Sequence, residues 1–595
     1  MVYMGMARSM PGNSTYQPSF ALCAGLAWLV IAGQLLWFDW AQTATALGDT
    51  DDAMRLLEVR EFLAGRGWFD LHEPRMQPPT GYDTHWSRFV DAGLAGVFLI
   101  IHAFTDVATA ERLMRVVWPL LWIGPALAGT AAIAWRLGGR AAAFVALLLL
   151  LFGLPAFVQF RPGRIDHHDI QISLALLTIA AAIWADRIRW TPWAAGVLTA
   201  FALAIGFEGI PFVVIGGAIF AARFVLDRNH SLALVHYGLA TAASTAVAFL
   251  LSVGPGHWTQ TACDAIAVNS AAPLIVGGLA LAGGATWFVR PSIMTRCSVI
   301  AIAIATMAGV FALIEPRCLG GPLAMVDPAV KPIWLAHVIE AKSVFETLRS
   351  SPVLGIGVVA YPIAAAIAMI MLACDEKMRR DEAFIVVATV EIVAIAMTII
   401  AVRASAYTLW FGVPLVAAAL PRIFDWFKFK TLPARALVVL ALSPVVICFG
   451  AIALSEALGV HQAKAGSQRD DGCLAIKSYA SLAKLAPGLV VADVDLGPFI
   501  LALTPHSVLA GPYHRLSYGI IASYRTFAAP PDQAREILRQ AGATYVVTCG
   551  ERGPRDLPEP DGQQSLWRHL TEGRPPNWLE AIPESGPIAI YRFKQ

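Results

Sequence analysis

The chain has 595 residues, of which 57% are hydrophobic and only 14% are charged, and its mean hydropathy is +0.61. Soluble domains carry about 25% charged residues, so the composition excludes an ordinary soluble protein and indicates a polytopic α-helical membrane protein. The formal net charge of +2 and the lack of a basic block argue against a nucleic-acid partner and leave the lipid bilayer as the expected environment.

Long apolar runs predict the membrane-spanning helices. The first run, at 20–38, is too long for a signal-peptide core and is expected to be retained. The run at 90–105 follows the polar stretch THWSRFVD and is better explained as a helix lying at the membrane surface. The remaining runs predict about thirteen spans, near 20–38, 112–136, 141–158, 168–186, 190–206, 210–226, 233–253, 272–289, 296–314, 353–374, 383–402, 405–420 and 433–455.

The distribution of lysine and arginine predicts the topology. With the N-terminus inside, Arg136, Arg187 and Lys377 all fall in inner loops, whereas the outer loop 254–271 has neither lysine nor arginine. This asymmetry is typical of the positive-inside pattern. The outer face then receives the loops 39–111, 159–167 and 315–352, Arg403 and the C-terminal tail.

The composition changes near residue 458 and predicts two domains. Residues 1–458 form the expected transmembrane domain, and 459–595 are rich in proline, glycine and charge. This second part alternates a helix-like stretch, Gln533–Ala541, with the strand-like GLVVAD, ATYVVTC and IAIYRF, which indicates a soluble mixed α/β domain. Cys473 and Cys549 both fall in it, and a disulfide between them is possible. We expect a multi-pass protein of the inner (cytoplasmic) membrane with this domain on the periplasmic side.

Polar residues gather in RPGRIDHHDIQ, at 161–171, between two apolar runs. Each charge would cost about 2.5–3.5 kcal/mol at the centre of a bilayer, and a position at the outer surface avoids most of this cost. Asp166 and His168 offer a carboxylate and an imidazole that can bind one cation. The alternative is that these residues only cap the next helix, for which Asp169 alone suffices. The cluster therefore favours a functional site.

Two other outer loops carry candidate side chains. The stretch GDTDDAMR places Asp49, Asp51 and Asp52 ahead of a helical pattern, where they either cap the helix or form a metal or general-base site. Glu340 lies in an irregular loop rich in glycine and proline that suits a mobile element, although a solvated amphipathic helix is the simpler explanation.

Arg403 begins a predicted span at the outer boundary of the membrane. A long basic side chain at this depth either reaches out to the interface or recognises a phosphate group.

In this order, the elements resemble the catalytic subunit of oligosaccharyltransferases, which belongs to the GT-C glycosyltransferase superfamily. That family has thirteen spans, an aspartate followed six residues later by arginine in its first outer loop, and D-x-D or D-H-H in its second. Asp49 and Arg55 match the first motif, and DHH at 166–168 matches the second. HVIEAKS, with Glu340, resembles a degenerate form of the family's fifth-loop motif, and Arg403 stands where the family has an arginine that meets the donor pyrophosphate.

The resemblance implies a glycosyltransferase with a GT-C fold. It would move a sugar or oligosaccharide from a polyprenyl-(pyro)phosphate donor to a glycan, lipid or protein acceptor at the outer face, with metal assistance and inversion. The expected ligands of Mg²⁺ or Mn²⁺ are Asp49, Asp166, His168 and Glu340. The expected catalytic residues are Asp49, Arg55, Asp166 and Glu340. The cation and Arg403 would offset charge on the leaving phosphate, and we expect Arg161 and Arg164 to help neutralise it.

One motif departs from the family. The W-W-D-Y-G motif that reads an Asn-x-Ser/Thr acceptor is replaced by VDLGPFI, which keeps Asp495 and Gly497 but has no tryptophan. The later AGPYHRL resembles the loop that follows the motif, so Asp495 and His514 are the acceptor-side candidates. An acceptor other than asparagine is at least as well supported as true asparagine-linked transfer.

The rival from another class is a transporter or flippase of lipid-linked glycan. Such a protein should carry ionisable residues or broken helices near the middle of the membrane. The predicted spans here are apolar and the charges gather on one face, which favours an enzyme over a transporter or an inactive scaffold.

Overall fold

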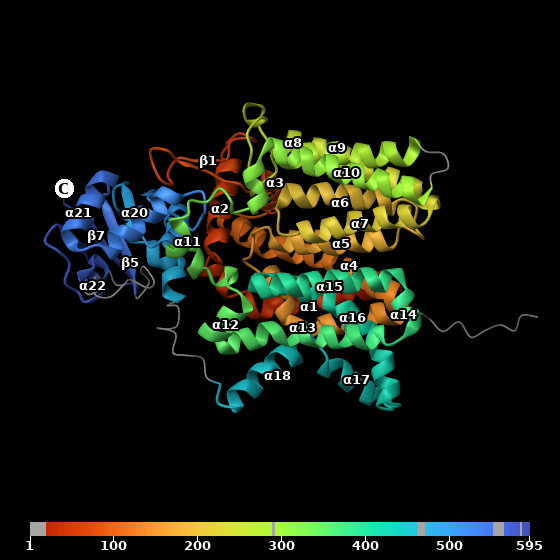
Figure 1. The fold of residues 1–595 in the computed structure, drawn as a ribbon. Helices are drawn as coiled ribbons and strands as arrows, with labels where there is room; N and C mark the ends of the chain where they lie inside the picture. The colour runs from red at the N-terminus through yellow and green to blue at the C-terminus, as the bar shows by residue number, and fades with distance from the viewer. Residues whose placement is uncertain (1–18, 288–291, 461–470, 551–563, 584–585, 595) are drawn as a thin grey trace, which may run out of the picture.

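The computed structural model describes residues 19–287, 292–460, 471–550, 564–583 and 586–594. Figure 1 shows a bundle of long helices that run in roughly one direction, with a smaller domain built around a sheet at one end of it. The predicted inner N-terminal segment before residue 19, the last residues of the run 272–289 and parts of the predicted domain 459–595 lie outside the described residues.

The bundle has the composition of a multi-pass membrane protein. Its helices are α1 (Phe20–Asp39), α4 (Val107–Leu151), α5 (His168–Ile183), α6 (Thr191–Ile205), α7 (Ile210–Leu226), α8 (Ser231–Ser252), α9 (Val268–Trp287), α10 (Ile293–Ile314), α13 (Pro352–Ala373), α15 (Glu382–Ile400), α16 (Ser405–Trp426), α17 (Leu432–Ala441) and α18 (Pro444–Ala457). Within the described ranges, eight helices are long and apolar enough to cross a membrane, or nine if the bent pair α17–α18 is one span. The count of thirteen stays a prediction, because α5, α6 and α7 are shorter apolar helices.

Helix α4 takes the place of two predicted spans. A straight helix of its 45 residues would be about 68 Å long, more than twice the ~30 Å hydrocarbon core. The helix breaks at Gly138 and Gly139, where Gly139 has a φ of 72° that residues with a side chain rarely adopt. The chain turns back there, since the N–H of Gly163, beyond the end of α4, donates to the carbonyl of Arg115 near its start at 2.9 Å.

The predicted inner loops meet at the end of the bundle away from the sheet domain. Arg136 lies 3.3 Å from Asp186 and 3.5 Å from Asp381. Arg223 lies 2.5 Å from Glu382, close to the short α14 (Glu376–Arg380), which Figure 1 places at that end. The loops that the lysine and arginine pattern groups together therefore do share one end of the bundle.

The predicted outer loops lie between the bundle and the sheet domain. The first holds α2 (Thr50–Leu63), β1 (His72–Glu73), β2 (Tyr82–Asp83) and α3 (Arg88–His102). Helix α3 covers the apolar run that we did not count as a span. Its 15 residues are fewer than the roughly 20 that a membrane-spanning helix needs. The loop before α13 contains η5 (Pro316–Gly320), α11 (Val330–Ile333), η6 (Leu335–His337), η7 (Ile339–Ala341) and α12 (Val344–Ser350).

The C-terminal domain is built on a five-stranded mixed sheet of order β4-β3-β5-β7-β6. Its strands are β3 (Leu489–Ala492), β4 (Ser507–Val508), β5 (Tyr545–Cys549), β6 (Leu579–Ile582) and β7 (Ile588–Phe593). Strand β3 pairs in parallel with β4 and β5, and β7 is antiparallel to β5 and β6. Helices α19 (Gly497–Leu503), α20 (Ser517–Ala528), α21 (Pro531–Ala541) and α22 (Leu566–Thr571) complete it. The three predicted strands and the predicted helix are all present.

Two disulfides lie at the end of the bundle that carries the sheet domain. Cys473 forms a disulfide with Cys549 inside that domain, a pairing that the sequence indicated only as possible. Cys263 bonds Cys318 and joins the loop after α8 to η5, a pairing that the spacing gave no reason to expect. The exposed Cys374, next to α14 at the opposite end, is unpaired. Disulfides persist in oxidising compartments. The end of the bundle with the disulfides therefore suits an oxidising compartment, and the end with the free Cys374 suits a reducing one.

One carboxyl departs from the apolar character expected of the spans. Glu391 of α15 is fully buried in the bundle, and neither of its oxygens has a hydrogen-bond partner among the described residues. The backbone of Gly412 lies close to it, since a Cβ there would be in ordinary contact with a Glu391 oxygen, at 3.5 Å.

Candidate functional site

Arg115 of α4 holds the first two outer loops together. Its guanidinium donates to the carbonyls of Ala46 and Thr43 at 3.1 Å, and its own carbonyl accepts from Gly163 at 2.9 Å. Because the buried side chain of Arg115 holds one segment and its backbone carbonyl holds the other, the start of α2 and the polar stretch before α5 are fixed next to each other.

The aspartates of the first loop have different tasks at the start of α2. Asp49 is the N-cap, and its side chain accepts from the N–H groups of Asp51 and Asp52. The buried Asp52 completes a capping box and also accepts from the N–H groups of Ile165, at 2.7 Å, and Asp166, at 3.2 Å. Gly48 makes room for it, because a Cβ there would lie 2.2 Å from its carboxylate. Asp52 therefore fastens one loop to the other.

The D-H-H motif forms a compact ligand set. One carboxylate oxygen of Asp166 lies 2.5 Å from His167 Nδ1, and the other lies 2.9 Å from His168 Nε2. These three side chains offer ligand atoms within 4.8 Å of one another. Neighbouring ligands of an octahedral Mg²⁺ at about 2.1 Å are themselves about 3 Å apart, so the spacing of the Asp166 oxygen and His168 Nε2 fits a shared divalent cation.

The aspartates around this cluster are close enough to the histidines and to one another to have shifted pKa values. Burial works to raise the pKa of Asp166, but the charges of His167 and His168 lower it well below its usual range. Burial, together with the charges of Asp166 and Asp49, raises the pKa of Asp51 well above its usual range. Carboxyl groups crowded in this way favour a bound cation, because its charge offsets their mutual repulsion.

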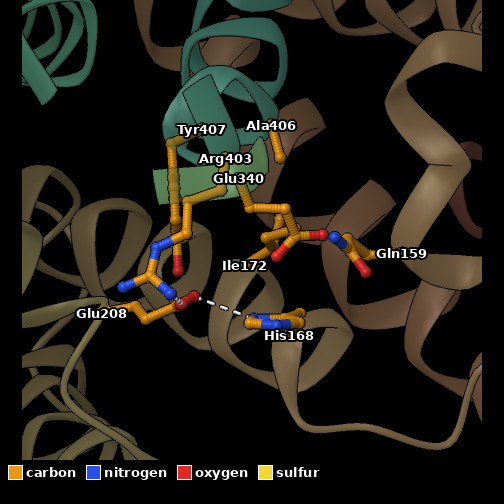
Figure 2. Close-up of a pocket in the computed structure, with 8 residues that line it drawn as sticks. All are labelled: Gln159, His168, Ile172, Glu208, Glu340, Arg403, Ala406 and Tyr407. Carbon is orange, nitrogen blue, oxygen red and sulfur yellow. Dashed lines mark hydrogen bonds and ion pairs between the residues drawn. The ribbon is translucent and has the colours of Figure 1, made fainter. Parts of the chain in front are cut away.

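A small pocket adjoins the cluster (Figure 2). It is lined by Gln159, His168, Ile172, Glu208, Glu340, Arg403, Ala406 and Tyr407. His168 Nδ1 lies 2.9 Å from Glu208, which in turn lies 3.2 Å from Arg403. Glu340 points across the pocket toward Gln159. The structure thus brings together three residues predicted from separate loops: His168, Glu340 and Arg403.

The fifth outer loop is tied to the span that begins at Arg403. The N–H of Val402 donates to the carbonyl of Lys342 at 2.9 Å, which holds η7, with Glu340, against the residues around Arg403. Glu340 is exposed, and Arg403 is half exposed toward the pocket. The loop expected to be irregular is a string of short helical turns that ends beside the site.

The predicted arginines take different positions. Arg161 pairs with Asp39 at the end of α1, and Arg164 pairs with Asp49. Burial opposes the shift, but Arg164 lowers the pKa of Asp49 below its ordinary value. Both arginines lie at the rim of the site, where their predicted help with phosphate stays a prediction.

Arg55 lies apart from the pocket. It is fully buried, 2.7 Å from Asp91 and 3.3 Å from Glu58, with its guanidinium 4.4 Å from the centre of the Trp86 ring. Asp91 also lies 2.9 Å from Arg88. This is the environment of a residue that holds α2 to α3, and the catalytic role predicted for Arg55 has no contact with the pocket to support it.

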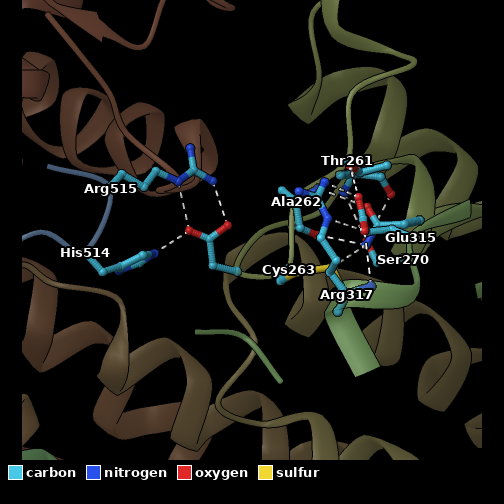
Figure 3. Close-up of a disulfide and its surroundings, with 12 residues drawn as sticks. Thr261, Ala262, Cys263, Ser270, Glu315, Arg317, His514 and Arg515 are labelled. Carbon is cyan, nitrogen blue, oxygen red and sulfur yellow. Dashed lines mark hydrogen bonds and ion pairs between the residues drawn. A yellow bond between two sulfur atoms is a disulfide. The ribbon is translucent and has the colours of Figure 1, made fainter. Parts of the chain in front are cut away.

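The two acceptor-side candidates are not brought together. Asp495 lies in η12 (Val494–Leu496), just before α19, and its carboxylate makes no hydrogen bond or ion pair within the described residues. His514 lies 2.6 Å from Asp264. Arg515 donates hydrogen bonds to both carboxylate oxygens of the same aspartate. Figure 3 shows His514 and Arg515 beside the loop that the Cys263 disulfide anchors. His514 therefore docks the sheet domain onto an outer loop.

Glu208 and Asp264 are the functional candidates that sequence reasoning missed. Glu208 stands in GFEG, between two apolar runs, and a carboxyl flanked by glycines in so short a turn was the available signal. Asp264 had none, because the loop 254–271 was noticed only for its lack of lysine and arginine.

Comparison with known proteins bears on the fold. No protein-family model and no curated protein sequence matches the chain. Among solved structures, the archaeal oligosaccharyltransferase AglB from Archaeoglobus fulgidus, in complex with an inhibitory peptide and a dolichol-phosphate, is similar with a TM-score of 0.64 and 16% identity, over 89% of this chain and 69% of that chain.

Two further structures of the Archaeoglobus fulgidus oligosaccharyltransferase are similar. The form tethered to an acceptor peptide containing the NVT sequon has a TM-score of 0.61 and 18% identity, over 89% of this chain and 69% of that chain. The complex with Zn and sulfate has a TM-score of 0.56 and 17% identity, over 89% and 68%. At these identities the likeness shows the fold alone, so the chain has the fold of the archaeal oligosaccharyltransferase, as the resemblance of its motifs implies.

Proposed function

We propose that the protein is a membrane glycosyltransferase that moves a sugar or oligosaccharide from a polyprenyl-(pyro)phosphate donor to an acceptor at the outer face of the inner membrane, with inversion. The observation that carries the proposal is the pocket in which His168, Glu340 and Arg403 meet, next to Asp166, in a GT-C fold. Arg403 lies at the start of the apolar helix α16 and is half exposed, so its guanidinium is available to a lipid-linked phosphate at this end of the bundle.

The site chemistry supports a divalent cation, Mg²⁺ or Mn²⁺. The side chains that would hold it are Asp166 and His168, with Asp49 and Glu340 from the neighbouring loops. When bound, the cation would act as a Lewis acid on phosphate oxygens. The zinc and sulfate complex of the archaeal enzyme is a precedent for a divalent cation in this fold.

The chain's own residues then have separate tasks. Arg403 binds the donor phosphate and stabilises the negative charge that develops as the bond between the anomeric carbon and the phosphate oxygen breaks. Asp49 orients the acceptor group and takes its proton as it attacks the anomeric carbon from the opposite side. A single displacement of this kind inverts the configuration. The polyprenyl-(pyro)phosphate separates from the sugar as the leaving group and remains bound to Arg403.

The replaced acceptor motif supports an acceptor other than a sequon peptide. Asp493 and Val494 stand in place of the two tryptophans, and the residues that follow the motif, Phe499 and Ile500, are fully buried in α19. Helix α19 packs against α2, so this segment serves as an internal contact of the outer domain. The site lacks the tryptophans that would read an Asn-x-Ser/Thr peptide. A hydroxyl group of a glycan or lipid therefore suits it better as the acceptor than a peptide does.

The sidedness is supported by two independent features. The basic inner loops meet at one end of the bundle, and both disulfides lie at the other end, with the pocket and the sheet domain. Basic loops face the cytoplasm, and disulfides form outside it. Both features point to a periplasmic pocket and C-terminal domain.

Metal removal tests the proposal directly. We expect the full-length protein, with a fluorescent polyprenyl-pyrophosphate glycan and Mn²⁺, to release or transfer the sugar, and EDTA to stop this until Mn²⁺ is added in excess. Separate reactions offer a sequon peptide, a glycolipid and a soluble glycan as acceptors. Turnover that persists in EDTA would contradict the metal assignment. The absence of turnover with mono- and pyrophosphate donors alike would contradict the enzyme assignment, and efficient peptide transfer would overturn the acceptor assignment.

The substitution Asp49→Asn separates capping from catalysis. Asparagine caps helices about as well as aspartate but loses the charge that pairs with Arg164, so we expect the melting temperature to fall only slightly. Asparagine cannot take a proton and is a weaker cation ligand, so we expect sugar transfer to fall about 10²–10³-fold. A variant with full activity would show that Asp49 only caps α2, and would transfer the acidic role to the adjacent Asp51.

A further inference from the structure

Glu208 lies in the short turn between α6 and α7, and helix α5 fixes that turn in place. The amide oxygen of Gln171 in α5 accepts from the N–H of Gly209 at 3.0 Å. Gly206 packs so closely against Gln171 that a Cβ there would lie 2.2 Å from its amide nitrogen. Gln171 follows His168 by three residues, so both point from one face of the same helix. Helix α5 therefore sets the position of His168 and of Glu208 together.

The two carboxylate oxygens of Glu208 have different partners. Oε2 lies 2.9 Å from Nδ1 of His168, and Oε1 lies 3.2 Å from a terminal nitrogen of Arg403 (Figure 2). The side chain is only 17% exposed, so few water molecules compete for these contacts. One carboxylate thus joins an imidazole of the proposed cation site to the proposed phosphate ligand.

We propose that Glu208 is a positioning residue that acts through both partners. It presents Nε2 of His168 to the cation, and it holds Arg403 where its guanidinium can bind the donor phosphate next to that cation. This inference rests on the proposed function, because it assigns a task within the same site. It goes beyond it by naming a residue that neither the motifs nor the ligand set includes.

The imidazole contact sets which nitrogen of His168 is available. When Nδ1 donates its hydrogen to a carboxylate, Nε2 keeps a lone pair and becomes a better ligand. Nε2 is the atom that lies 2.9 Å from the Asp166 carboxylate, on the side where the cation is proposed. Without Glu208, the ring is free to carry its hydrogen on Nε2 or to rotate, and either change removes a ligand.

The guanidinium contact leaves Arg403 able to bind phosphate. Arginine has five N–H donors in a rigid fork, and Glu208 engages one terminal nitrogen. The remaining donors are free for the donor phosphate. The carboxylate also lies between two positively charged centres, the proposed cation and Arg403, and so reduces the repulsion between them.

Binding of Mn²⁺ to the purified full-length protein, followed by the electron paramagnetic resonance signal of free Mn²⁺, tests the first half of the proposal. We expect Glu208→Ala to weaken Mn²⁺ binding about 10–100-fold, as loss of such a partner does at other metal sites. In a His168→Ala background the same change should cost less than about twofold further, because Glu208 would have no ligand left to position. The matched control is Glu111→Gln, a carboxyl of similar exposure that pairs with Arg60, and it should leave Mn²⁺ affinity unchanged.

The variant Glu208→Gln tests the second half and keeps the size of the side chain. Its amide oxygen can still accept from His168, while its amide group puts hydrogen atoms against Arg403. We expect Mn²⁺ affinity closer to the wild type than in Glu208→Ala, together with a raised KM for the lipid-linked donor. A residue that only stabilised the fold would lower the melting temperature and leave these two constants unchanged.

The outcomes separate this inference from the proposed function. If the wild type binds Mn²⁺ and transfers sugar but Glu208→Ala binds Mn²⁺ equally well, the positioning role is wrong and the enzyme assignment stands. If Glu208→Ala costs as much in the His168→Ala background as alone, Glu208 does not act through His168. A wild type that neither binds Mn²⁺ nor turns over a lipid-linked donor would overturn the proposed function and this inference with it.

Discussion

The substitution Asp166→Ala is expected to lower sugar transfer about 10³-fold or more and to abolish measurable Mn²⁺ binding. The carboxylate is nearly fully buried, and its two oxygens face the two histidines of the motif, so no other side chain can move into its place. Losing a cation that contributes several kcal/mol to charge stabilisation corresponds to about three powers of ten in rate. The measurements are turnover of a fluorescent lipid-linked donor and Mn²⁺ binding to the same preparation.

A neighbouring residue provides the control for Asp166. Asp169 lies in the first turn of α5, three residues after Asp166, and is about as buried, but its carboxylate accepts from the N–H of Ile170 and is outside the ligand set. We expect Asp169→Asn to keep turnover within about threefold, because asparagine can accept the same bond. Equal losses in the two variants would mean that any change at the start of α5 disrupts the site, and the case for Asp166 as a ligand would fail.

The sequence predicted most of the apolar helices and singled out candidate site residues next to them. Asp166, His168, Glu340 and Arg403 were found because charged groups are costly inside a bilayer, so each charge beside an apolar run needs a reason. The predicted spans 112–136 and 141–158 bracket the break inside α4 at Gly138 and Gly139, but the second run extends past the end of α4 at Leu151 into η2 (Leu154–Phe160). The predicted run 168–186 matches α5, but its 16 residues are fewer than the number that usually crosses a bilayer.

Contacts between distant segments explain what the sequence could not reveal. Arg115 falls inside an apolar helix and has no motif, yet it joins the two outer loops that form the site. Asp264 and His514 are 250 residues apart, and only the packing of the sheet domain on the bundle makes them partners. Glu208 needed the fold for the same reason, since its two partners come from α5 and from the start of α16.

Arg55 is the converse case, in which a motif position predicts a catalytic role and the surroundings favour a structural one. Burial, together with the charge of Asp91, raises the pKa of Glu58 to about 8, so Asp91 is the main counter-ion of Arg55. The Asp91 carboxylate lies between Arg55 and Arg88, all three nearly fully buried. Arg55 thus joins α2 to α3, and its predicted contact with the substrate stays a prediction.

The substitution Asp91→Ala is therefore expected to destabilise the outer domain by about 3–5 kcal/mol, because it leaves two buried guanidinium groups without their shared carboxylate. The matched control is Asp83→Ala, which removes an exposed partner of His72 and should cost less than about 1 kcal/mol. Thermal unfolding in detergent gives the stabilities, and turnover per folded molecule at low temperature gives the activities. If Arg55 only holds α2 to α3, then Arg55→Met loses stability as Asp91→Ala does, while its folded fraction keeps turning over donor. If the folded fraction of Arg55→Met is inactive at an unchanged Mn²⁺ affinity, then the arginine of the motif acts on the substrate, and the structural role assigned to it here is wrong.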